Sequence, residues 1–149
     1  MKTSILFLAA IAGCITACNP KSGTQKTEST STTTAKESYE YINNKDTITL
    51  NYTADGNVIT GTLKSVLGGS TRSVGTLEGT IKGDTIIADY TMDPARQEKT
   101  AIRQVAFLKK DGKLLEGYGE TGDKDGKIIF TDISKLKFID AVTLSSKTK

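Results

Sequence analysis

The sequence of 149 residues contains no histidine and no tryptophan, and only two cysteines and two prolines. Histidine is the side chain that most often acts as a general base or a metal ligand near neutral pH, so its absence removes the commonest catalytic and zinc-binding chemistry. The absence of tryptophan removes the largest aromatic surface on which a sugar ring could stack. We therefore expect a protein that is not an enzyme, with no catalytic residue, no metal site and no cofactor.

Charge of one sign is not in excess either. The chain has 20 lysines and arginines against 17 aspartates and glutamates, a net charge of +3, and the basic residues are scattered along it. Proteins that bind nucleic acids concentrate their basic side chains into a patch or stripe, so we expect no nucleic-acid partner. Hydrophobic residues make up 36% of the chain and aromatic residues 6%, which allows one modest core in a single domain.

One short apolar run opens the chain. Residues 5–17 are apolar or small and follow Lys2, and a run of this length is too short for a membrane-spanning helix, which needs roughly 20 residues. The run is therefore typical of a signal peptide, residues 1–17. It ends in Ile15-Thr16-Ala17-Cys18, which resembles the lipobox of bacterial type II signal peptides. The resemblance implies cleavage before Cys18 and attachment of diacylglycerol and an acyl chain such as palmitate at this cysteine.

Two alternatives to this interpretation remain. Ile11-Ala12-Gly13-Cys14 also fits the lipobox, although cleavage at Cys18 leaves the longer apolar run and is followed at once by polar residues. The second alternative is that the segment is an ordinary secretory signal in which the cysteine is incidental.

The residue after Cys18 is Asn19 rather than aspartate. By resemblance to the sorting rules of Gram-negative lipoproteins, this residue indicates the outer membrane. We expect a lipid-anchored protein of the cell envelope that faces the periplasm.

A polar segment follows the cysteine. Residues 19–38 contain 4 serines and 6 threonines, with no aromatic and no large aliphatic side chain. Such a composition buries too little apolar surface to offset the entropy lost on ordering, so it predicts a flexible tether over residues 18–38. The folded domain is then expected to occupy residues 39–149.

From residue 39 onward, apolar and polar residues alternate with a period of two, which is typical of half-buried strands. The predicted strands are residues 40–43, 46–53, 57–66, 72–82, 85–92, 100–109, 113–121, 127–131 and 136–144. No amphipathic helix of ten residues or more is apparent in this part of the sequence. The sequence predicts an all-β fold, an antiparallel meander of about eight or nine strands that forms a small barrel or sandwich. An open sheet packed on itself is the alternative.

Turn dipeptides separate the predicted strands, namely Asp55-Gly56, Gly83-Asp84, Asp111-Gly112 and Asp125-Gly126. A two-residue turn at the first dipeptide places Tyr52 opposite Ile59, and a turn at the second places Ile81 opposite Ile86. Both registers bring the apolar residues onto one face. Glycines also occur inside the predicted strands, at positions 61, 75, 79, 117 and 119, as expected where a sheet bends strongly or two backbones approach closely.

The hairpin at Asp111-Gly112 brings together the candidate binding residues. A two-residue turn there gives the pairs Phe107–Glu116, Val105–Tyr118 and Arg103–Glu120. One face of the hairpin therefore combines Arg103, Phe107, Glu116, Tyr118 and Glu120, and inside a barrel this face would form a pocket for a small ligand. On the outside, which is where sheets commonly carry such pairs, Arg103–Glu120 would be an exposed ion pair that contributes less than about 1 kcal/mol.

Two further motifs concern ions and modification. Asp123-Lys124-Asp125-Gly126 lacks the third carboxylate and the distal glutamate of a calcium-binding loop, so it predicts a hairpin turn. The phrases Asp46-Thr47-Ile48 and Asp84-Thr85-Ile86 resemble the acceptor sequence for O-glycosylation in envelope proteins of Bacteroidota. This resemblance implies glycosylation at Thr47 and Thr85.

Longer phrases carry a resemblance over residues 75–144. The sequence GTLEGTIKGDTIIADYT at residues 75–91 is followed by RQVAFL at residues 103–108 and EGYGE at residues 116–120. These phrases are similar to those of a family of small Bacteroidota lipoproteins without an assigned activity, and residues 93–99 depart from its pattern. The resemblance implies an envelope location and no particular chemistry. Two functions remain open: a module that binds a small or lipidic ligand, or an accessory that docks an envelope protein complex.

Overall fold

The computed structural model describes residues 34–93, 95 and 101–147, and most of them lie in β-strands. The elements are β1 (Ala35–Asn43), β2 (Asp46–Asp55), β3 (Val58–Leu67), β4 (Thr71–Lys82), β5 (Thr85–Met92), β6 (Ile102–Lys110), β7 (Lys113–Tyr118), β8 (Thr121–Lys124), β9 (Lys127–Phe130), the short 3-10 helix η2 (Ile133–Lys135) and β10 (Lys137–Ser146). Within these described residues, no helix is long and apolar enough to cross a bilayer.

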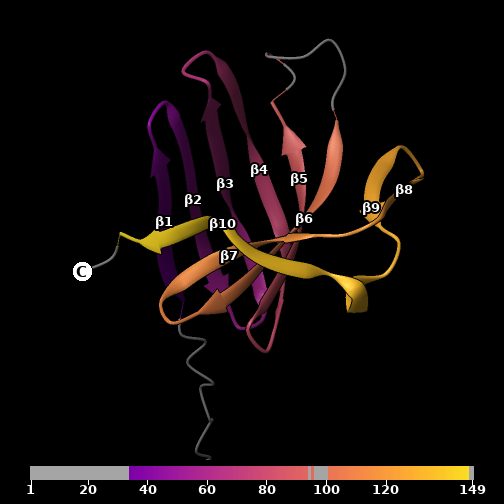
Figure 1. Cartoon of the computed structure of the whole chain (residues 1–149). Coiled ribbons are helices and arrows are strands. Elements are labelled where there is room, and N and C mark those ends of the chain that lie inside the picture. The colour runs from indigo at the N-terminus through magenta and orange to yellow at the C-terminus, as the bar shows by residue number, and fades with distance from the viewer. Residues whose placement is uncertain (1–33, 94, 96–100, 148–149) are drawn as a thin grey trace, which may run out of the picture. The chain divides into compact units, whose positions relative to one another are not determined.

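Eight of the strands form a closed antiparallel barrel. Strands β1 to β7 pair in sequence order, and β10 lies between β7 and β1. Pairing of β5 with β6 completes the ring, so the barrel has no free first or last strand. The hairpin of β8 and β9 lies outside the ring, where β9 pairs in parallel with β6 (Figure 1). The predicted all-β antiparallel meander is therefore confirmed, and of the predicted forms it is the barrel.

Two predicted strand boundaries differ from the observed ones by three or more residues. The first strand begins at Ala35, within the predicted tether, because Ala35 already pairs with Ala54 and the ladder of β1 with β2 continues to Asn43 and Asp46. The run predicted as one strand over residues 113–121 is broken after Tyr118. At Gly119 and Glu120 the chain leaves the barrel and enters the outer hairpin.

The hairpin registers show how turn chemistry places the strands. The turn at Gly83-Asp84 is confirmed, with Ile81 opposite Ile86. The turn predicted at Asp55-Gly56 was wrong, because Asp55 pairs with Val58 and the turn residues are Gly56 and Asn57. Gly56 occupies the first turn position at φ +58°, the same position and value as Gly83. The register therefore shifts by two residues, which keeps every side chain on its predicted face.

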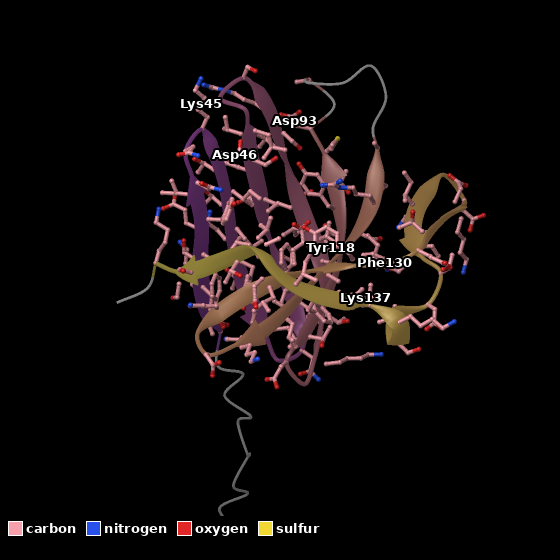
Figure 2. The ribbon with its side chains drawn as sticks, viewed as in Figure 1. Lys45, Asp46, Asp93, Tyr118, Phe130 and Lys137 are labelled. Carbon is pink, nitrogen blue, oxygen red and sulfur yellow. The ribbon has the colours of Figure 1, made fainter. Side chains whose placement is uncertain are left out.

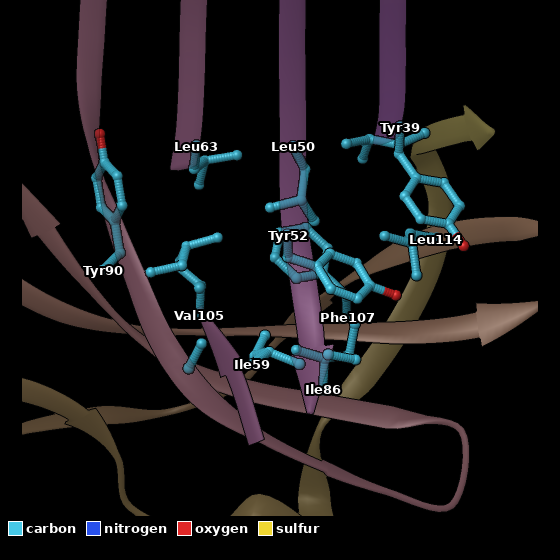
Figure 3. Packing of buried hydrophobic residues seen from close by; sticks show 14 residues of the cluster. Tyr39, Leu50, Tyr52, Ile59, Leu63, Ile86, Tyr90, Val105, Phe107 and Leu114 are labelled. Carbon is cyan, nitrogen blue, oxygen red and sulfur yellow. The ribbon is translucent and has the colours of Figure 1, made fainter. Parts of the chain in front are cut away.

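Large apolar and aromatic side chains fill the interior of the barrel (Figure 3), and some of them lie against glycines of neighbouring strands. The buried cluster consists of Tyr39, Leu50, Tyr52, Ala54, Ile59, Leu63, Leu77, Ile86, Ala88, Tyr90, Val105, Phe107, Leu114 and Leu144. Gly61 lies opposite Tyr52, and Gly75 lies against the ring edge of Tyr90. A β-carbon on either glycine would stand 2.2 Å from a carbonyl oxygen of the neighbouring strand, so only glycine allows this approach.

Candidate functional site

The inner faces of β6 and β7 contribute polar side chains to a cavity inside the barrel. Phe107 of β6 belongs to the buried core, and Arg103 has the same parity on this strand but is exposed, where the hollow opens to solvent. Glu116 lies opposite Phe107 on β7, and Tyr118 follows on the same face. The cavity has a volume of about 230 Å³ and is lined by Ile48, Leu63, Ser65, Leu67, Arg103, Phe107, Glu116, Tyr118, Val142 and Leu144. The face with mixed chemistry is therefore an inner face.

A second hollow adjoins this cavity where the barrel wall divides. Strands β6 and β7 pair only as far as Ala106 and Gly117, and beyond that point β6 pairs with β9. The hollow has a volume of about 290 Å³ and is lined by Arg103, Gln104, Val105, Glu116, Gly117, Tyr118, Gly119, Thr121, Ile128 and Phe130. The Gln104 side chain accepts a hydrogen bond of 3.2 Å from the backbone N–H of Phe130, which ties β9 to β6. The second hollow therefore lies beside the inner cavity and shares three of its lining residues, Arg103, Glu116 and Tyr118.

The predicted pairings of Val105 with Tyr118 and of Arg103 with Glu120 were wrong, because the ladder of β6 with β7 ends at Ala106 and Gly117. Because β7 ends at Tyr118, Glu120 lies beyond the ladder, and its carbonyl oxygen accepts a hydrogen bond of 2.9 Å from the N–H of Thr131. Glu120 instead borders an outer groove of about 410 Å³ together with Tyr118, Gly119, Thr131, Asp132, Lys135 and Lys137. Figure 2 shows Tyr118, Phe130 and Lys137 near one another at this junction. Four of the five predicted binding residues therefore lie around one cavity, and Glu120 does not.

Arg103 is positioned by an aromatic ring. Its guanidinium carbon lies 5.5 Å from the centre of the Tyr90 ring, the residue opposite it in the pairing of β5 with β6. The Tyr90 hydroxyl is in turn 2.6 Å from the hydroxyl of Ser73, which fixes the ring. None of the ion pairs among the described residues includes Arg103. Within the described part of the chain, the exposed Arg103 therefore lines the cavity without a carboxylate partner.

Glu116 is positioned by Tyr118 on the same strand. The Tyr118 hydroxyl donates a hydrogen bond of 2.8 Å to Oε2 of Glu116. Burial and this bond raise the pKa of Tyr118 to about 12, so the phenol stays protonated and remains a donor at neutral pH. The side of the cavity formed by β6 and β7 thus presents one cation, one carboxylate and one phenol.

The opposite end of the barrel interior is closed by a second polar cluster, which the sequence did not reveal. The Lys109 ammonium group lies 2.8 and 2.7 Å from the two carboxylate oxygens of Glu37, across the barrel from β6 to β1. The Tyr39 hydroxyl also donates to Glu37, and the buried Tyr52 hydroxyl lies beside this cluster without a hydrogen bond of normal geometry. Glu37 was missed because it was assigned to the tether.

The pKa values of this cluster follow from burial and hydrogen bonding. Burial opposes ionisation of Glu37, but hydrogen bonds from Lys109 and Tyr39 outweigh it and leave the pKa of Glu37 below its usual value. Burial, reinforced by the nearby carboxylate of Glu37, raises the pKa of Tyr39 and of Tyr52 well above the usual range. At neutral pH the cluster therefore consists of an ion pair and two neutral phenols.

The remaining predicted sites are the two glycosylation threonines, the turn at Asp123 and the lipidation cysteine. Thr47 lies near the start of β2 and Thr85 is the first residue of β5, and both are half-buried. Asp123 accepts a hydrogen bond of 3.3 Å from the N–H of Gly126, consistent with the predicted turn. No three histidine, cysteine, aspartate or glutamate side chains gather as a metal site among the described residues. Cys18, the signal peptide and residues 19–33 lie outside the described residues, as does most of the segment 93–99.

Comparison of the chain with protein-family models, with curated proteins and with solved structures gives no match. Any function must therefore be inferred from the residues of the barrel and from the signals in the sequence. Among the described residues, charged, hydrogen-bonding and apolar groups converge on the inner cavity, which is open to solvent on the side of Leu67, Arg103 and Tyr118.

Proposed function

We propose that this protein is a non-enzymatic binding module, lipid-anchored in the outer membrane through Cys18 and facing the periplasm, whose barrel binds a small or lipidic ligand. The observation that carries the proposal is the position of Arg103, Phe107, Glu116 and Tyr118 around one cavity inside the barrel. Ligand sites are typically apolar hollows with a few polar groups that orient the bound molecule. The lipobox and the resemblance to small Bacteroidota lipoproteins support the location.

The composition of the cavity wall favours a ligand over a purely structural role. Arg103 and Glu116 line the same hollow, and no ion pair joins them in the described structure, so both charges are available to a bound molecule. The inner cavity of about 230 Å³ and its neighbour of about 290 Å³ lie below the usual range for ligand sites, roughly 300–1,000 Å³. The occupant is therefore a small molecule or a single apolar chain. The docking alternative depended on a filled interior with these side chains outside; Phe107 is buried and Glu116 is half-buried, whereas Arg103 and Tyr118 are exposed.

Arginine 103 provides the test of ligand binding. We expect the Arg103→Ala variant to lose the bound ligand and to change the free energy of unfolding by less than about 1 kcal/mol, because its ring contact is partly exposed. The full chain is extracted from membranes into lipid nanodiscs, denatured, and the released small molecules are analysed by mass spectrometry. Arg72→Ala, an exposed change on β4 outside these hollows, is the matched control. Equal ligand content in both variants and wild type would contradict the assignment of the cavity.

Lipidation has its own test because the sequence offers two lipoboxes. We expect the Cys18→Ala variant to lose incorporation of labelled palmitate, whereas Cys14→Ala retains it, since Cys14 leaves with the signal peptide. Labelling is measured on the full chain in a bacterial host, with fractionation of its membranes. Loss of label only in Cys14→Ala would move the anchor to the earlier box. Full labelling of both single variants would contradict a unique lipidation site.

A further inference from the structure

Two opposite charges face the same hollow spaces without pairing. Arg103 and Glu116 both line the inner cavity and its lateral neighbour. No ion pair joins them in the described structure, where each is contacted by an aromatic residue, Tyr90 or Tyr118. Arg103 lies four positions along β6 from Phe107, the residue opposite Glu116, which is on the order of 13 Å of strand. The two side chains therefore start from well-separated points of one wall and reach the same two hollows.

The opposite wall of the inner cavity is apolar. Ile48 of β2 and Leu63 and Leu67 of β3 face the charged wall across the barrel. Val142 and Leu144 of β10 extend this apolar surface beside β7. A molecule that fills the cavity thus meets charge on one side and hydrocarbon on the other.

We infer that the barrel binds a small zwitterion with an apolar side chain, such as an apolar α-amino acid, whose carboxylate pairs with Arg103 and whose ammonium group pairs with Glu116. This inference rests on the proposed function and names the chemical class of its ligand. The Tyr118 hydroxyl keeps Glu116 oriented toward the ammonium group, and the apolar side chain occupies the space between Leu63, Phe107 and Leu144.

Singly charged ligands satisfy the site less well. A simple carboxylate pairs with Arg103 but is repelled by Glu116, and a simple amine pairs with Glu116 but is repelled by Arg103. Either one also leaves a partly desolvated charge without a partner, which costs free energy. Only a ligand that carries both charges matches both side chains at once.

Leucine and two truncated analogues test the inference. 4-Methylpentanoate has the side chain and carboxylate of leucine without its amino group, and 3-methylbutylamine has the side chain and amino group without the carboxylate. Binding to the full chain in lipid nanodiscs is measured by calorimetry. We expect leucine to bind at least tenfold more tightly than either analogue. Alanine, which keeps both charges but lacks the apolar branch, is expected to bind at least tenfold more weakly than leucine.

Two variants give a crossed pattern that a structural role would not produce. Arg103→Gln should weaken leucine at least tenfold and leave 3-methylbutylamine unweakened, because that amine does not use Arg103. Glu116→Gln should weaken leucine to a similar extent and leave 4-methylpentanoate unweakened. Arg72→Gln serves as the control and should change none of these affinities.

The outcomes separate this inference from the proposed function. If 4-methylpentanoate binds as tightly as leucine, the site accepts a simple anionic amphiphile, so the inference fails while ligand binding stands. Equal binding of 3-methylbutylamine overturns it in the same way. If no probe binds but a different molecule is released from the denatured wild-type protein, the inference fails and the proposed function stands. If no probe binds and nothing is released, both fail.

Discussion

Replacing Gly79 by valine should destabilise the barrel by about 3 kcal/mol or more, the upper end of the usual range for overpacking. A β-carbon at this position would lie 2.2 Å from the carbonyl oxygen of Ile87 and 2.5 Å from the α-carbon of Ala88. These are backbone atoms of the neighbouring strand, so the strands themselves must separate, and a closed barrel resists this separation. The free energy of unfolding in urea measures the effect, and the midpoint of thermal unfolding should fall by roughly 10 °C or more.

The adjacent position supplies the control. Thr80→Val introduces the same valine side chain one residue further along β4, at an exposed position on the outer face. We expect its free energy of unfolding to lie within about 0.5 kcal/mol of the wild type. If Gly79→Val is as stable as Thr80→Val, the close approach of β4 and β5 at Gly79 is not required by the fold.

The strand faces could be predicted from the sequence because side-chain parity survives errors in register. The turn at Gly56-Asn57 lies one residue beyond its predicted place, yet Tyr52 still faces the interior. The glycines inside the predicted strands also indicated a strongly bent sheet, and Gly79 does lie where the backbones of neighbouring strands approach closely. The strand order was harder to predict, because the chain first forms the outer hairpin of β8 and β9 and only then returns as β10 to pair with β7 and β1. Nothing local in the sequence encodes that pairing.

The candidate site could be predicted only in part. The hairpin register placed Arg103, Phe107, Glu116 and Tyr118 on one face, but local pairing does not tell which face of a hairpin becomes the inside of a barrel. That choice depends on all the strands together. Glu120 was misplaced because an unbroken alternation hides the end of a strand. The cluster around Glu37 joins β1 to β6 across the barrel, a contact that no sequence spacing indicates.

Glu37→Gln should destabilise the protein by about 1–2 kcal/mol at neutral pH. The carboxylate accepts hydrogen bonds from Lys109 and from Tyr39, and bonds to a charged group contribute roughly 1.5–3 kcal/mol when solvent does not screen them. Here the Glu37 side chain is 24% exposed and that of Lys109 is 41% exposed, which lowers the expected value. Unfolding in urea at a series of pH values measures both the size of the effect and its dependence on ionisation.

The sign of the pH dependence follows from the lowered pKa of Glu37. As pH falls, the unfolded chain binds a proton at this residue before the folded protein does, so stability is lost on acidification. The stabilisation is present above the ordinary pKa of about 4.5 and disappears as pH falls through the lower pKa of the folded state. The difference between wild type and Glu37→Gln should therefore shrink as the solution is acidified below about pH 4.5.

Glu40→Gln is the control for Glu37→Gln, because the two glutamate side chains are equally exposed but lie on opposite faces of β1. Glu40 lies on the same strand, its side chain is also 24% exposed, and it pairs with Lys147 at 3.1 Å. It has the opposite parity and faces outward, where an ion pair contributes less than about 1 kcal/mol. Glu40→Gln should therefore cost clearly less stability than Glu37→Gln. Equal losses would show that closure of the barrel end by Glu37, Lys109 and Tyr39 adds nothing beyond an ordinary surface ion pair.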